Sequence, residues 1–124
     1  MDSNSQADFP TDIIGLHVAE HGTDARVVTV TGEIDTLTAP KLANFLNEQL
    51  SAVQVVVLDL DGVEFLGSAG LSALFEANEL AHRERRDLRM VCHSRIANRA
   101  LEATELRAQF TVAESVLDAL KHSS

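Results

Sequence analysis

The feature that most constrains the fold is a short, almost continuous run of β-branched residues, Val53-Gln54-Val55-Val56-Val57-Leu58. The run is too short for a buried helix and lacks the polar alternation of a half-exposed strand. A strand of this kind is covered on both faces or lies centrally in a sheet. We therefore expect the rest of the chain to be arranged around a central strand at this position.

The segments on either side carry their own strand and helix signals, and together they predict an α/β fold. The expected elements are strands at 13–18 and 26–31 joined by a loop at 21–24, a helix from Thr38, the strand at 53–58, a helix from Ser68, a strand at 87–92, a helix at 95–103, an edge strand at 110–112 and a helix at 113–120. Thr38 and Ser68 are the expected N-caps. The order ββαβαβα(β)α, with an opening hairpin and strand–helix–strand crossovers, predicts a mixed sheet of four to five strands with about four helices.

One face of the second helix is expected to be buried. Its apolar side chains recur at helical spacing, with Leu71, Leu74, Phe75 and Ala81 on one side. Leu80 falls half a turn away from Leu71 and is expected to be exposed.

Length and charge limit the classes of function. A chain of 124 residues fits one domain, which we place at 13–122 after a flexible, polar segment at 1–12. The formal net charge of −9 disfavours binding to nucleic acid and to anionic membranes, and no segment is long and apolar enough for a membrane span. Cys92 is the single cysteine, so neither an intramolecular disulfide nor a thiolate zinc site can form. These features predict a cytoplasmic protein.

The segment that follows the central strand has two local interpretations. Asp59-Leu60-Asp61-Gly62-Val63 resembles the motif of haloacid-dehalogenase-like phosphohydrolases, in which Asp59 would be the nucleophile and Asp61 the general acid beside Mg²⁺. That chemistry also needs a cation for the phosphoryl group and later acids for the metal, and the chain has no downstream Asp-Asp or Asp-x-x-x-Asp pair. Alternatively, the two aspartates only end the strand and the glycines form turns.

A third interpretation covers more of the chain. The order of strand, Asp-Leu-x-x-Val-x-Phe-Leu-x-Ser-x-Gly-Leu and helix resembles the signature of STAS domains, the family of bacterial anti-sigma-factor antagonists. The matching positions are Asp59, Leu60, Val63, Phe65, Leu66, Ser68, Gly70 and Leu71. A second block, 32–42, resembles the family's Gly-Glu-Leu-Asp…Thr-Ala-Pro stretch. The resemblance extends over roughly residues 13 to 122.

The resemblance implies a binding protein without catalytic residues, metal or cofactor. A STAS domain of this type binds an anti-sigma factor that is an ATP-dependent serine kinase, and a sigma factor is thereby released to activate transcription. The alternative within the family is a regulatory or scaffold subunit of another complex. The positions that correspond to partner contacts are Glu33, Asp35, Gly67, Ser68, Ala69, Gly70, Leu71 and Ser72. For Glu33 and Asp35 an equal alternative is a solvated turn before the helix, in which Asp35 has a local capping role, and for Leu71 the alternative is core packing.

One position departs from the family pattern. The usual phosphoacceptor is the hydroxyl residue directly before the glycine, and here that residue is Ala69. Ser68 is the remaining candidate for phosphorylation, and Ser72 lies one turn into the helix. The resemblance therefore supports the binding surface and leaves its control by phosphorylation open.

The histidines do not indicate a metal site. His17, His21, His82, His93 and His122 are spread over different expected elements without the spacing of a metal-binding helix. Cys92 and His93 are neighbours at the end of a strand, so their side chains are expected on opposite faces. We expect Cys92 to be a buried, small apolar residue.

Overall fold

The computed structural model describes residues 14–121. In it the valine-rich strand is the central strand of the sheet. In chain order the elements are β2 (Ile14–His21), β3 (Ala25–Ile34), α1 (Ala39–Ala52), β4 (Val55–Leu66), α2 (Ser68–Arg83), β5 (Asp87–Val91), α3 (Arg95–Ala103), the 3₁₀-helix η3 (Leu106–Gln109), β6 (Thr111–Val112) and α4 (Val116–Lys121). The segment at 1–12, which the sequence predicts as flexible, lies outside the described residues, as do Ile13 and His122. The predicted order ββαβαβα(β)α is confirmed.

The described strands form one five-stranded sheet in the order β2-β3-β4-β5-β6. β2 and β3 form an antiparallel hairpin, and each later strand is added parallel to the one before it. The valine-rich strand β4 is central, as predicted, and β6 is at one edge. Right-handed crossovers that always move in the same direction along the sheet place their helices on the same face.

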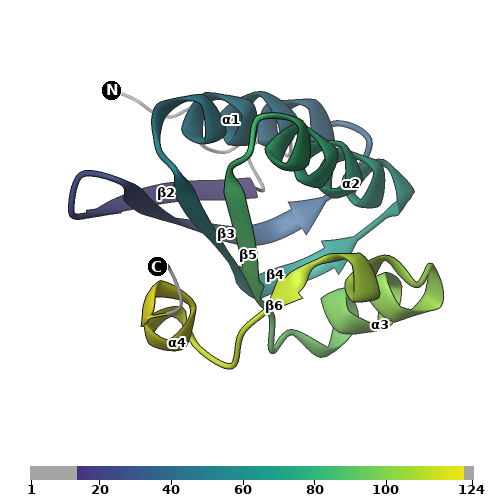
Figure 1. Cartoon of the computed structure of the whole chain (residues 1–124). Helices are drawn as coiled ribbons and strands as arrows, with labels where there is room; N and C mark the ends of the chain where they lie inside the picture. The colour runs from purple at the N-terminus through teal and green to yellow at the C-terminus, as the bar shows by residue number, and fades with distance from the viewer. Residues whose placement is uncertain (1–13, 122–124) are drawn as a thin grey trace, which may run out of the picture.

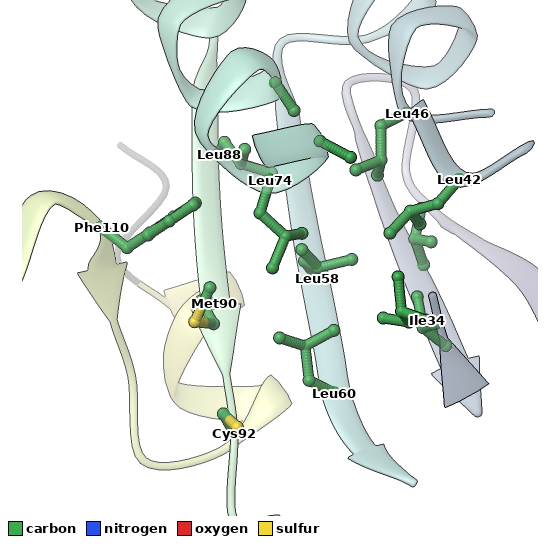
Figure 2. Close-up of a cluster of buried hydrophobic side chains, with 14 of the residues drawn as sticks. Ile34, Leu42, Leu46, Leu58, Leu60, Leu74, Leu88, Met90, Cys92 and Phe110 are labelled. Carbon is green, nitrogen blue, oxygen red and sulfur yellow. The ribbon is translucent and has the colours of Figure 1, made fainter. Parts of the chain in front are cut away.

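The main core lies on that face. Figure 1 shows α1 and α2 side by side over the sheet, and Figure 2 shows the side chains between them. Leu42, Leu46, Leu58, Leu60 and Leu74 are all fully buried there. The helix α3 packs against β4 and η3, and its buried residues join the same cluster.

The helix α4 returns to the opposite face. There Ala119 packs against a smaller cluster of valines on β3, β4 and β5, formed by Val27, Val55, Val57 and Val91. Arg89, which is 6% exposed, donates from Nη1 to the carbonyl oxygen of Ala119 at 2.5 Å. Both faces of the central strand are therefore covered, which accounts for its unbroken run of apolar residues.

The predicted end of the central strand is wrong. β4 does not stop at Leu58 but continues to Leu66, through the residues that the sequence suggested as a turn. The pairing with β3 shifts register twice on the way, once between Thr29 and Thr31 and once between Gly32 and Glu33. Because bulges of this kind accommodate an extra residue while the strand continues, Asp61 and Gly62 are part of the sheet rather than of a loop.

Two side chains of α2 differ from the predicted pattern. Phe75, which was expected on the buried side, is 39% exposed, and Leu80 is half-buried rather than exposed. The buried face is instead centred on Leu74, Ala77 and Ala81. This face is rotated away from Phe75, which a count of apolar residues alone cannot show.

Candidate partner-binding surface

The two sequence blocks that suggested a binding surface meet where β3 and β4 end. Glu33 pairs with Phe65 across the parallel ladder, and Ile34 pairs with Leu66. The amide of Gly67 donates to the carbonyl oxygen of Ile34 at 2.9 Å. The acidic end of β3 is thus joined by backbone hydrogen bonds to the start of α2, although the two blocks lie far apart in the sequence.

Asp35 has a local structural role. Its Oδ1 accepts hydrogen bonds from the amides of Leu37 and Thr38, at 3.0 and 3.1 Å. The Thr38 Oγ1 in turn accepts from the amide of Asp35 at 2.8 Å, and this reciprocal pair is equivalent to a capping box. Thr38 is the N-cap residue of α1, as predicted, but its side chain makes no capping hydrogen bond to the helix and is used in this turn instead. Asp35 is half-buried, while Glu33 is exposed and can meet a partner.

The start of α2 depends on two glycines. Gly67 is the N-cap, with an extended backbone, so the prediction that Ser68 caps this helix is wrong by one residue. Gly70 lies so close to β3 that a Cβ atom there would be 2.5 Å from Ile34 Cγ2 and 2.7 Å from Leu66 Cδ1. Only glycine lets the first turn of α2 approach the ends of β3 and β4 this closely. Leu71 is half-buried and packs against the main core, as its structural alternative predicted.

A shallow groove runs beside this junction, between the starts of α1 and α2. It has a volume of about 260 Å³, and its lining residues are Thr36, Ala39, Pro40, Ala43, Ala69, Ser72, Ala73 and Glu76. Two apolar side chains are exposed in the neighbouring segments, Leu37 at 72% and Phe65 at 46%. Ser68 is exposed, and among residues 14–121 its hydroxyl has no hydrogen-bond partner. The predicted residues thus lie around a surface that combines exposed acidic and apolar side chains with a shallow groove.

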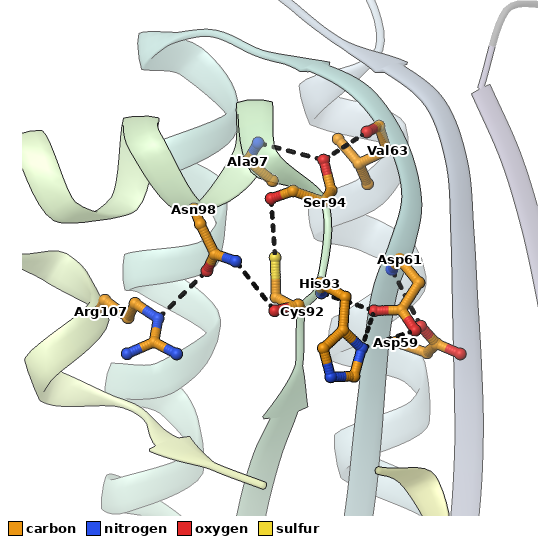
Figure 3. Close-up of polar contacts among 9 residues, drawn as sticks. All are labelled: Asp59, Asp61, Val63, Cys92, His93, Ser94, Ala97, Asn98 and Arg107. Atoms are coloured by element: carbon orange, nitrogen blue, oxygen red, sulfur yellow. Dashed lines mark hydrogen bonds and ion pairs between the residues drawn. The ribbon is translucent and has the colours of Figure 1, made fainter. Parts of the chain in front are cut away.

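A second polar cluster, which the sequence did not predict, joins β4 to the segment after β5 (Figure 3). The amide of His93 donates to Asp61 Oδ1 at 2.7 Å, and the imidazole Nδ1 lies 3.1 Å from both carboxylate oxygens. The Asp61 carboxylate raises the pKa of His93 above its ordinary value. Asp59 Oδ1 accepts from the amide of Asp61 at 2.9 Å. No local signal could reveal this cluster, because its two sides are separated by 32 residues.

Cys92 and His93 directly follow the end of β5, and Figure 3 shows their side chains pointing away from each other. The Cys92 thiol is buried, and this burial raises the pKa of Cys92 above its ordinary value. His93 is exposed, so the prediction that the two side chains point to opposite faces is confirmed. A buried thiol with a raised pKa is a poor nucleophile, which agrees with the prediction that Cys92 serves as a small apolar residue.

The aspartates of the phosphohydrolase-like motif both accept hydrogen bonds from nearby backbone amides. The Asp59 carboxylate accepts from the backbone amide of Asp61, and the Asp61 carboxylate binds His93. Within residues 14–121, no three or more His, Cys, Asp or Glu side chains are grouped so that they could hold a metal ion. In the same part of the chain, none of the helices combines the length and the apolar character that crossing a bilayer requires.

Known proteins resemble the chain in sequence and in fold. The family model of the STAS domain matches residues 17–119. The anti-sigma-F factor antagonist RsfB of Mycobacterium tuberculosis, from two strains, is 41% identical over 69 residues, which cover 55% of this chain and 56% of the relative. The chain therefore matches little more than half the length of these curated relatives.

Solved structures agree over a longer stretch. An anti-sigma factor antagonist from Mycobacterium paratuberculosis is 32% identical, with a TM-score of 0.79 over 91% of this chain and 95% of that one. The anti-sigma factor antagonist SpoIIAA in its unphosphorylated form is only 12% identical, with a TM-score of 0.72 over 86% of this chain and 94% of its own, and shows the likeness of fold. The match of the family model, together with the mixed sheet and its helices, shows that this chain belongs to the STAS domain family.

Proposed function

We propose that this chain is an anti-sigma-factor antagonist, which binds an anti-sigma factor of the serine-kinase type and so releases a sigma factor to activate transcription. The names of its relatives support the first part of this proposal. The kinase nature of the partner rests on the resemblance of the two sequence blocks to those of the family. The chain itself would contribute a binding surface and no catalytic group.

The observation that carries the proposal is the junction of β3 with α2. The Gly67–Ile34 hydrogen bond and the close approach at Gly70 hold the first turn of α2 rigidly beside Glu33. A rigid surface loses little conformational entropy on binding, which favours recognition by a partner. The predicted contacts Glu33, Asp35, Gly67, Ser68, Ala69, Gly70, Leu71 and Ser72 would all lie on or directly beneath this surface.

The charge of the surface predicts a basic partner site. Glu33→Gln is expected to weaken binding of a kinase-type anti-sigma factor about threefold to fivefold, because it removes an exposed charge from the rim of the interface. Its unfolding midpoint should stay unchanged, since no hydrogen bond of the Glu33 side chain exists within residues 14–121. Binding is measured by titration calorimetry with the purified anti-sigma factor, and unfolding by circular dichroism.

Substitutions of a second acidic residue of this surface and of an acidic residue far from it serve as controls. Asp35→Asn keeps the Oδ1 acceptor of the capping turn while removing the charge, so any loss of affinity reports on partner contact. Glu102→Gln changes an equally exposed charge on α3 and should leave affinity unaltered. Failure of the wild-type chain to bind any kinase-type anti-sigma factor of its host would contradict the proposal and favour a STAS subunit of another complex. Mg²⁺-dependent phosphatase turnover that Asp59→Asn abolishes would point to the phosphohydrolase instead.

Control by phosphorylation would have to bypass the usual acceptor position. Ala69 stands there, at the second position of α2, and carries no oxygen. Incubation of the chain with the kinase-type partner and ATP is expected to leave 67–72 unmodified, as measured by mass spectrometry. Ala69→Ser should restore an acceptor, and its phosphorylation should release the partner because the phosphate adds close to two negative charges to the interface. Phosphate on Ser68 of the wild-type chain would show that the exposed hydroxyl before Ala69 has taken over the role.

A further inference from the structure

The last part of β4 is paired with a neighbouring strand on one side only. The pairing of β4 with β5 ends at Asp59 and Val91, whereas β4 continues to Leu66. On its other side, β4 stays paired with β3 as far as Leu66, with two register shifts after Asp59. The stretch from Asp61 to Leu66 leads directly into the proposed partner-binding surface, and on the side of β5 no ladder holds it.

Residues that follow β5 form hydrogen bonds to this last part of β4. His93 binds the Asp61 carboxylate through both its backbone amide and its ring nitrogen, as described above. Ser94 Oγ donates to the carbonyl oxygen of Val63 at 2.7 Å and also accepts from the amide of Ala97 at 3.2 Å, which makes it the N-cap of α3 (Figure 3). The contacts therefore extend the connection between β4 and the β5 side past the point where the ladder stops.

We propose that Asp61, His93 and Ser94 form a clamp that positions the end of β4, and with it the start of α2, and that the clamp weakens as the pH rises and His93 loses its proton. The part of this proposal that concerns binding rests on the proposed function. The three residues are positioning residues, because they act on the partner surface through the backbone between Val63 and Gly67. They lie outside the predicted contact residues.

The direction of the pH effect follows from the charges around His93. Asp61 on β4 and Glu114, in the segment between β6 and α4, both raise the pKa of His93 above its ordinary value of 6.5, and Asp61 has the larger effect. The Asp59 carboxylate on β4 adjoins Asp61 through the Asp61 amide. A raised pKa means that the folded state favours the imidazolium. The stabilising ion pair is therefore complete below the ordinary pKa of histidine and is lost as the pH rises through the raised pKa of His93.

Hydrogen exchange tests the clamp without any partner. The reporters are the amides of Gly67 and Leu71, which are bonded to Ile34 O at 2.9 Å and to Gly67 O at 3.0 Å. In Asp61→Ala these amides are expected to exchange about fivefold faster, the factor that corresponds to loss of one typical net hydrogen bond. The amide of Leu42 in α1 should keep its wild-type rate. Unchanged rates at Gly67 and Leu71 would overturn the clamp.

Conservative variants separate the parts of the clamp. Ser94→Thr keeps a hydroxyl and should behave as wild type, whereas Ser94→Ala should speed exchange at Gly67. His93→Gln keeps the backbone bond to Asp61 but cannot carry a charge. The wild-type protection factors should therefore fall as the pH rises above the ordinary histidine pKa of 6.5, and those of His93→Gln should not. His17→Gln, on exposed β2, is the matched histidine control and should retain the wild-type pH dependence. The same pH dependence in His93→Gln would overturn the role of this histidine.

The effect of the clamp on affinity is measured with the anti-sigma factor that binds the wild-type chain. Asp61→Ala should lower its affinity by about the same fivefold factor as the change in exchange, because a less populated binding geometry lowers the apparent affinity in proportion. Faster exchange with unaltered affinity would show that the clamp does not serve the partner surface. If the wild-type chain binds no anti-sigma factor, the proposed function fails, while the exchange results still decide whether the clamp exists.

Discussion

Gly70→Val is expected to abolish partner binding and to lower the free energy of unfolding by about 2–3 kcal/mol, the effect of overpacking a well-packed core. A Cβ atom at this position would come within 2.5 Å of Ile34 Cγ2 and 2.7 Å of Leu66 Cδ1, and both neighbours are buried. The first turn of α2 must therefore move away from the ends of β3 and β4. The loss of affinity is measured by titration with the anti-sigma factor, and the stability by urea unfolding.

Two substitutions by the smaller alanine side chain test whether the effect comes from the close contact at Gly70. Gly70→Ala adds the same close contact but gains about 1 kcal/mol in helix propensity, so its stability should lie between those of the wild type and Gly70→Val. Gly67→Ala should be tolerated, because the added Cβ meets mainly the ring of Phe65, at 3.1 Å, and that ring is exposed and can move. Full binding by Gly70→Val would show that the close approach at Gly70 is not needed for the surface.

Leu58→Ala is expected to destabilise the chain by about 3 kcal/mol or more, through lost burial and the cavity that remains. Leu58 is fully buried on the central strand, and Figure 2 shows it in the same cluster as Leu60 and Leu74. Urea unfolding followed by circular dichroism gives the difference. Val18→Ala, at a position that is 39% exposed on β2, should change the stability by less than about 1 kcal/mol. Similar losses for the two variants would contradict the assignment of Leu58 to the core.

The sequence predicts the element order because each element has a strong local signal. The helix at 95–103 is found with the predicted bounds, since Ser94 caps it and its apolar residues have helical spacing. The central strand can be recognised because its β-branched run is too short to form a buried helix. The two motif blocks also meet as the family resemblance implies, because the parallel pairing of β3 with β4 brings them together.

The remaining errors come from features that are not local. Asp61 and Gly62 are typical turn residues, yet they continue β4, because pairing with β3 and a bulge outweigh their turn preference. Ser68 is a better N-cap residue than Gly67, but the hydrogen bond from Gly67 to Ile34 O fixes the extended residue one position earlier. The pairing of Asp61 with His93 depends on how far β4 extends past β5, which tertiary packing determines.

The position of α4 has a consequence for synthesis on the ribosome. Val55, Val57 and Val91 belong to strands that precede this helix, and their outer face acquires its cover only when Ala119 has emerged. At about 5–20 residues per second, the nascent sheet would present an open apolar stripe for a second or more before that happens. During that time these valines are open to contacts that the folded chain does not make, and the docking of α4 ends this exposure.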